Sequence, residues 1–119
     1  MPTKEEHLQQ AEHNEKFFRS FDLEKTEFRD WAVVSAFYAA VHWINAYLLT
    51  QGCRPKNHRT RDNAIRMYAV TKKVAWEYSE LKNHAFNARY MVHRFSAKQV
   101  NEQVVPFLEA IKKQITARI

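Results

Sequence analysis

The feature that most restricts the fold of this chain is an unbroken apolar run from Asp30 to Leu49. The run contains no glycine, no proline and no charged residue after Asp30. It predicts a long helix, and a helix that is apolar nearly all round is normally buried. A membrane-spanning role is disfavoured, because Ser35, His42 and Asn45 would need polar partners in lipid. The run therefore predicts the central helix of a helical domain.

Four polar side chains fall on one stripe of this predicted helix. They are Ser35, Tyr38, His42 and Asn45. Burying polar groups costs free energy unless each of them finds a hydrogen-bond partner. The stripe therefore either lines a functional site or forms part of a hydrogen-bonded core, and these two alternatives remain open from the sequence. Tyr38 and His42 are accordingly candidate substrate-binding residues.

The scarcity of turn-forming residues predicts an all-α fold. Glycine occurs once, at position 52, and proline three times, whereas strand-rich chains need more turns than this supplies. We expect a single domain over residues 1–119, folded as an up-and-down bundle of four to five helices. The expected helices cover residues 3–21, a segment from Asp22 or Thr26 to Gly52, residues 58–70, residues 71–90, and a last helix capped by Ser96 and interrupted at Pro106.

The formal net charge of +6 is concentrated in the middle of the chain. Residues 53–95 hold 10 Lys and Arg but only 3 Asp and Glu. Such asymmetry indicates RNA or another polyanion, or else an acidic protein partner. The dispersed histidines and the single Cys53 provide no metal-ligand pair, so we expect no metal and no cofactor. The polar N-terminal residues and the lone cysteine predict a cytoplasmic protein that does not engage a membrane.

Two pairs of basic residues have the chemistry to act on RNA. Arg89 and His93 lie four positions apart, so a continuous helix would place them on one face. Imidazole moves protons near neutral pH and guanidinium stabilises charge on phosphate, which makes this pair the candidate catalytic site. His58 and Arg61 form a second pair, three positions apart. The candidate substrate-binding residues are His42, Tyr38, His58, Arg59, Arg61 and Tyr90.

Short motifs along most of the chain share their order and spacing with a known family. They are Ala11-x-His13-Asn14, Asp30-Trp31, Phe37-Tyr38-Ala39-Ala40-x-His42, His58-x-x-Arg61 and Ala88-Arg89-Tyr90. Together they resemble small stand-alone members of the HEPN superfamily. The resemblance implies a helical bundle that is often dimeric. It also implies an RNA-binding domain with the activity of a metal-independent endoribonuclease, or a toxin-like component of a defence system.

The family signature is an arginine followed by a histidine after four to six residues. Here three residues separate Arg89 from His93, and three separate Arg54 from His58. Family members without the signature are non-catalytic binding or assembly modules. The alternative interpretation is therefore a non-catalytic interaction module that docks an acidic protein partner. A nucleotide-binding partner of a nucleotidyltransferase is a third interpretation, by analogy with the family alone.

Aromatic residues make up 13% of the chain, which is more than one small bundle is expected to bury. Because large exposed apolar patches normally mark interfaces, we expect a homodimer with two-fold symmetry. The candidate interface residues are Trp43, Tyr47, Phe86 and Phe95.

Overall fold

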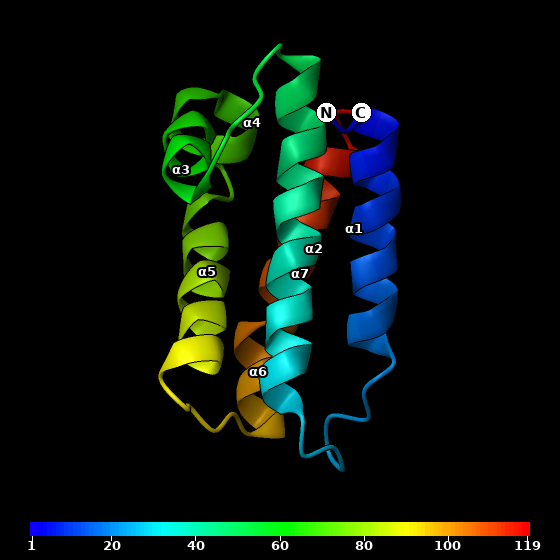
Figure 1. Ribbon diagram of the computed structural model, residues 1–119, viewed down its shortest axis with the longest axis vertical. Helices are drawn as coiled ribbons and strands as arrows, with labels where there is room; N and C mark the ends of the chain where they lie inside the picture. Colours follow the sequence, from blue (N-terminus) through cyan, green and yellow to red (C-terminus); the bar gives the residue numbers. More distant parts are fainter.

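The computed structural model describes residues 1–119 and contains helices but no strands. Three long helices, α1, α2 and α5, and a fourth column made of α6 and α7 in succession form the bundle, and the short α3 and α4 lie beside one end of α2 (Figure 1). The helices are α1 (Lys4–Arg19), α2 (Arg29–Thr50), α3 (His58–Met67), α4 (Ala69–Lys72), α5 (Ala75–Tyr90), α6 (Ala97–Gln103) and α7 (Val105–Thr116). The predicted all-α bundle is confirmed.

The predicted central helix is confirmed as α2, which packs against α1, α5, α6 and α7. Phe37, Trp43 and Ile44 of this helix are among the largest fully buried side chains of the protein. α2 is long and apolar enough to cross a membrane, but 78% of its apolar window is buried inside the bundle. Its apolar surface is therefore explained by the core of a globular domain.

Gly52, Ser96 and Pro106 mark helix ends as predicted. Gly52 follows α2 with a φ of 73°, the left-handed conformation that a non-glycine residue rarely adopts. The Ser96 hydroxyl accepts a hydrogen bond from the backbone N–H of Gln99, and α6 begins at the next residue. Pro106 lies in the first turn of α7, where the lack of an N–H group costs little. The last helix is therefore divided into α6 and α7.

The start of α2 lies further along the chain than predicted. α2 begins at Arg29, and its N-cap residue Phe28 makes no side-chain capping bond. Asp22 and Thr26 accept hydrogen bonds from the backbone N–H groups of Glu24 and Phe28 instead. Such short-range bonds stabilise turns in competition with helix, so the predicted caps at Asp22 and Thr26 are wrong.

The predicted boundary between residues 70 and 71 is also wrong, because it lies within the short helix α4. Thr71 is fully buried, and its hydroxyl donates a hydrogen bond of 2.8 Å to the carbonyl oxygen of Ile65. This bond ties α4 back to α3, and α5 begins only at Ala75.

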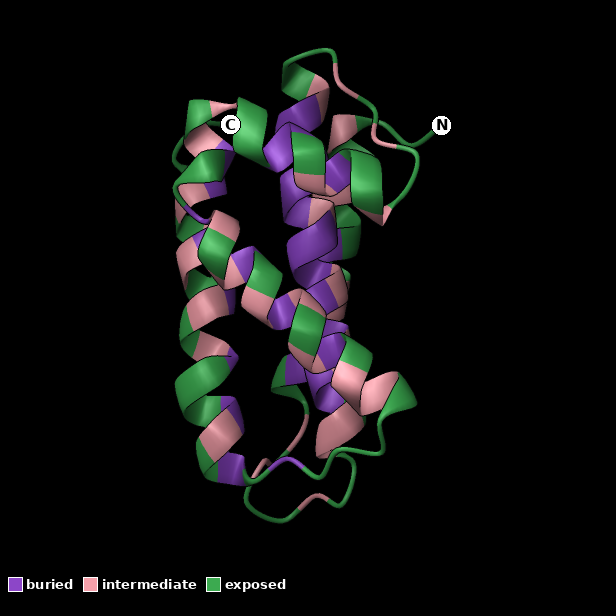
Figure 2. Cartoon of the chain, turned by 90° about the vertical axis from the view of Figure 1, so that its left-hand side faces the viewer, coloured by how far each residue is buried: buried purple, intermediate pink, exposed green.

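Three of the four aromatic residues predicted at an interface belong to the core instead. Trp43, Tyr47 and Phe95 are 2%, 7% and 5% exposed and pack in the central apolar cluster, whereas Phe86 is 50% exposed. The surface that carries exposed aromatic side chains includes the outer face of α5, which mixes exposed and partly buried residues (Figure 2). The large exposed apolar residues away from the termini are Phe17, Phe28, Trp31, Met67, Trp76, Phe86, Tyr90, Met91 and Val92.

Candidate functional site

The four polar side chains of the α2 stripe have four different hydrogen-bond partners. Ser35 donates a hydrogen bond of 2.7 Å to the Ala32 carbonyl oxygen within its own helix. The other three members of the stripe reach different helices: Tyr38 contacts α5, His42 contacts α1 and Asn45 contacts α3. Ser35, His42 and Asn45 therefore form hydrogen bonds inside the bundle. Tyr38 instead faces a cleft that is open to solvent.

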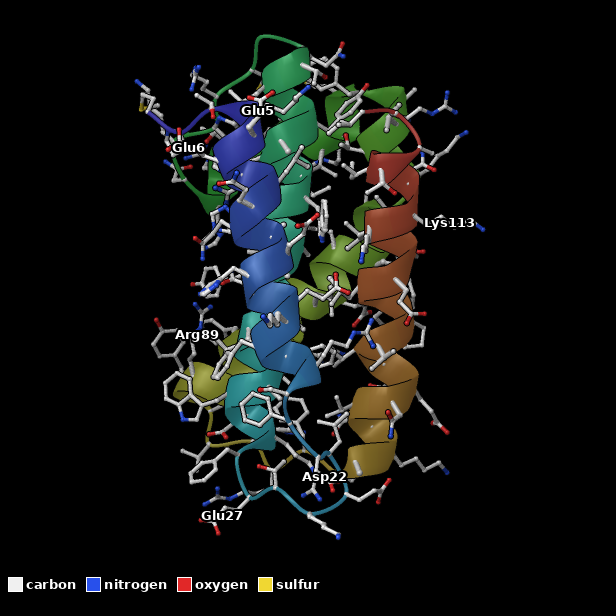
Figure 3. The ribbon with its side chains drawn as sticks, turned by 90° about the vertical axis from the view of Figure 1, so that its right-hand side faces the viewer. Glu5, Glu6, Asp22, Glu27, Arg89 and Lys113 are labelled. Atoms are coloured by element: carbon white, nitrogen blue, oxygen red, sulfur yellow. The ribbon has the colours of Figure 1, made fainter.

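Tyr38 lines a cleft of about 360 Å³ among α2, α3 and α5, which we call the Arg89 cleft. Its lining residues are Tyr38, His58, Lys82, Asn83, Phe86, Arg89 and Tyr90. Figure 3 shows Arg89 on the opposite side of the bundle from Lys113 of α7. Four of the predicted site residues, which come from three helices, are thus neighbours in this one cleft.

Arg89 is held in place by groups that leave its charge unpaired. Its Nε donates a hydrogen bond of 3.2 Å to the Ala85 carbonyl oxygen, and its Nη1 donates to the Tyr38 hydroxyl. The guanidinium carbon lies 5.5 Å from the ring centre of Tyr38 and 5.2 Å from that of Tyr90. No carboxylate forms an ion pair with Arg89, so the remaining N–H groups are available to an anion.

Arg61 lies behind the cleft as a second arginine without a carboxylate partner. Only 8% of its surface is exposed, and its Nε donates a hydrogen bond of 2.9 Å to Asn45 Oδ1. Its Nη1 lies 3.1 Å from His58 Nδ1. Burying a cation without a counter-ion is expensive, so such a group is rarely retained for stability alone.

The bond from Arg61 determines which nitrogen of His58 carries the proton. A guanidinium can only donate, so His58 Nδ1 must accept, and the proton of the neutral ring then lies on Nε2. Burial, followed by the nearby charges of Arg61 and Lys82, lowers the pKa of His58 below its usual value. At neutral pH this ring is therefore an uncharged hydrogen-bond donor.

Lys82 and Asp62 form an ion pair at the edge of the cleft. Lys82 is therefore partly neutralised, and Arg89 is the lining cation that lacks a carboxylate partner. Apart from Asp62, no carboxylate forms an ion pair with any residue around the cleft.

His42 lies outside the cleft, although we predicted that it binds substrate. Its Nδ1 is 2.9 Å from Nδ1 of His7, so α1 and α2 share a histidine pair in which one ring donates and the other accepts. Burial, and then the neighbouring His7 and Arg61, lower the pKa of His42 to about 4. This geometry gives His42 a role in joining α1 to α2 rather than in contacting a ligand at the Arg89 cleft.

The predicted catalytic partner His93 lies in a different pocket from Arg89. α5 ends at Tyr90, and Val92 adopts a φ of 51°, so the chain turns away before His93. The His93 ring stacks edge-on to Phe95 at 4.3 Å between ring centres, and its Nε2 lies 3.2 Å from Gln99 Oε1. The helix face that would have joined Arg89 to His93 does not extend to His93. Arg59, a further predicted site residue, is exposed and does not line the Arg89 cleft.

Sequence reasoning missed Lys82, Asn83 and Phe86 as neighbours of Arg89 in the cleft. Lys82 and Phe86 lie seven and three positions before Arg89, so they share its helix face, and this signal was present in the sequence. The pairing of Asn45 with Arg61 had no comparable signal, because it joins two helices across a loop.

Arginine donors, a neutral imidazole donor and aromatic rings around one open cleft can bind an anion attached to a flat ring. No group of three or more His, Cys, Asp or Glu side chains gathers in the protein in a way that could hold a metal ion. The chain matches the family model described as HEPN domain over residues 5–116. It therefore belongs to the HEPN domain family, a family of RNA-targeting ribonucleases in toxin and defence systems. No curated protein and no solved structure matches the chain.

Proposed function

We propose that this HEPN domain binds single-stranded RNA in the Arg89 cleft and contributes to a toxin-like defence system in the cytoplasm. The observation that carries the proposal is the convergence of two arginines without carboxylate partners, Arg61 and Arg89, on the rings of His58 and Tyr38. A phosphate in the cleft would pair with the Arg89 guanidinium directly, and its negative charge would also offset the buried charge of Arg61 behind His58.

Phosphate binding suits the polarity of every group at the cleft. Arg89 has free N–H donors, His58 presents its Nε2–H as a donor, and Lys82 adds a positive charge that Asp62 partly neutralises. The rings of Phe86 and Tyr90 provide flat apolar surfaces on which an unpaired base can stack. A base-paired duplex would keep its bases away from these rings, so the cleft favours single strands.

Catalysis is a separate part of the proposal. Cleavage of RNA requires a base for the 2′-hydroxyl and an acid for the leaving oxygen, and the Arg89 cleft holds one histidine, whose Nδ1 is already occupied. We propose that metal-independent cleavage, where it occurs, uses Arg89 and His93 and requires a rearrangement or a second copy that brings them together. A homodimer that covers the exposed Met91 and Val92 would provide that second copy.

The test compares Arg89→Gln with Lys113→Gln in binding a fluorescent RNA decamer. Both variants lose one positive charge, but Lys113 is exposed on the opposite side of the bundle (Figure 3). A hydrogen bond to a charged group contributes about 1.5–3 kcal/mol, so Arg89→Gln should raise Kd by about 10- to 150-fold. Lys113→Gln should change Kd by less than about threefold, since exposed charges far from the ligand are screened.

Three outcomes would overturn the proposal of RNA binding in this cleft. Equal effects of the two substitutions would mean that RNA responds only to net charge. Binding of a polyglutamate peptide in preference to RNA would favour the alternative, a module that docks an acidic protein. The absence of any RNA binding at low salt would remove the proposed function.

A further inference from the structure

A second groove lies beside the Arg89 cleft and has no role in the function proposed above. It has a volume of about 280 Å³ and lies between α3 and α5. Lys82 and Asn83 line both this groove and the Arg89 cleft, so the two form one continuous track along α5. We call it the Trp76 groove, and its lining residues include Asp62, Arg66, Trp76, Tyr78, Lys82 and Asn83.

Trp76 is exposed over 61% of its surface at the edge of this groove. Its ring meets that of Phe107 from α7 edge-on, with 5.0 Å between ring centres, and this contact supports the indole from behind. An exposed tryptophan of fixed orientation costs free energy in water and provides a flat platform for another ring.

Arg66 provides an unpaired cation at the same groove. Its Nη2 donates a hydrogen bond of 2.7 Å to Asn63 Oδ1, and no carboxylate forms an ion pair with it. Arg66 is also exposed, so its other N–H groups are free to meet a phosphate. A cation beside an aromatic platform is the arrangement that binds a nucleotide rather than an apolar ligand.

One polar atom of a residue that lines the groove has no hydrogen-bond partner. Asp62 Oδ1 is unpaired, whereas Asp62 Oδ2 pairs with Lys82. Tyr78 is only 2% exposed and lies next to Arg61, and burial raises the pKa of its phenol to about 12, so the hydroxyl keeps its proton. An unpaired buried acceptor costs free energy, and the amino group of a nucleobase edge would satisfy Asp62 Oδ1.

Aromatic and cationic side chains alternate along the shared track. Trp76, Lys82, Phe86 and Arg89 follow one another on α5, and the rise of a helix places the first and last about 20 Å apart. A stacked single strand advances about 3.4 Å per nucleotide, so about six nucleotides cover this distance. An acidic peptide would use the cations but would leave the rings of Trp76 and Phe86 exposed to water.

From this geometry we infer that the Trp76 groove is a base-binding subsite for the RNA strand whose phosphate Arg89 holds. One unpaired base stacks on the indole of Trp76, its edge faces Asp62, and Arg66 meets the adjacent phosphate. The inference rests on the proposed function, because the strand must first occupy the Arg89 cleft.

The test measures the affinity of an RNA decamer for Trp76→Ala, Trp76→Phe and Trp31→Ala. Trp31 is the matched control, because it is 56% exposed but lines neither the groove nor the cleft. Stacking of one base contributes about 1–3 kcal/mol, so Trp76→Ala should raise Kd by about 5- to 150-fold. Trp76→Phe should recover most of this loss, and Trp31→Ala should leave Kd unchanged.

An abasic decamer with the same phosphates separates stacking from a loss of structure. The abasic strand should bind the wild-type protein more weakly, and Trp76→Ala should weaken its binding no further. If Trp76→Ala weakens both strands equally, or neither, the base-binding subsite is wrong. If Arg89→Gln weakens the decamer while Trp76→Ala does not, the Arg89 cleft stands and only the subsite fails. If the wild-type protein does not bind RNA at all, the proposed function fails together with the subsite.

Discussion

Removing the charge of Arg61 should reveal whether the protein retains this residue for function or for stability. Arg61→Met keeps most of the apolar stem but leaves Asn45 Oδ1, a buried acceptor, without its donor at 2.9 Å. An unsatisfied buried polar group costs about 1–3 kcal/mol. We therefore expect the single substitution to lower the free energy of unfolding by about 2 kcal/mol, which corresponds to a fall in Tm of about 8 °C for a domain of this size.

The double variant Asn45→Leu/Arg61→Met removes both partners of that hydrogen bond. Replacing a buried polar pair with apolar groups of similar volume is often neutral or stabilising. Urea unfolding followed by circular dichroism should therefore place the double variant within about 1 kcal/mol of the wild-type protein. RNA affinity should nevertheless fall more than about tenfold, because the variant lacks the cation that orients His58.

The stability of the double variant decides between the two roles of Arg61. A double variant that is no more stable than Arg61→Met would refute the reasoning, because Arg61 would then be structural. A stable double variant that binds RNA as tightly as the wild-type protein would also refute it, since Arg61 would then have no role at the cleft.

Two further predictions concern histidines outside the cleft. The pKa of His42 is about 4 in the folded protein and 6.5 in the unfolded chain, so the unfolded chain takes up the proton first as the pH falls. The free energy of unfolding should therefore be highest above pH 6.5 and should decrease by about 1–2 kcal/mol between pH 6.5 and 4, after allowance for the partial exposure of the ring. His42→Gln should flatten the dependence of unfolding free energy on pH in that window, and an unchanged slope would assign the effect to other groups, such as His7. His93→Ala should reduce any cleavage of RNA about 100- to 10,000-fold in the presence of a chelator and leave the Kd for RNA unchanged. Cleavage that survives this substitution but stops with the chelator would show that the chemistry is metal-dependent.

The fold was largely predictable because its main signal is local. The apolar run of α2, the turn at Gly52 and the cap at Ser96 each depend on residues close together in the chain. The caps at Asp22 and Thr26 were mispredicted because these residues form alternative turns with the same side-chain oxygens. Local sequence does not show which of two competing short-range hydrogen bonds forms.

The candidate site was only partly predictable, because it is assembled from three helices. The stripe of α2 indicated Tyr38, and the pair His58 and Arg61 does form a hydrogen bond. The separation of Arg89 from His93 depends on where α5 ends, and the left-handed residue there is Val92, which carries none of the usual signals for that conformation. The sequence also could not show that Arg61 lacks a carboxylate partner, since this depends on where every carboxylate lies in the folded structure.

The most direct test of RNA binding in the Arg89 cleft is an NMR titration of this 14.2 kDa protein with a single-stranded RNA decamer. Backbone amide shifts should change most along α5 from Lys82 to Tyr90 and near Tyr38 and His58, while those of α7 around Lys113 stay constant. Shift changes centred on α7, or spread evenly over all exposed lysines and arginines, would contradict the account, because the RNA would then not occupy the cleft.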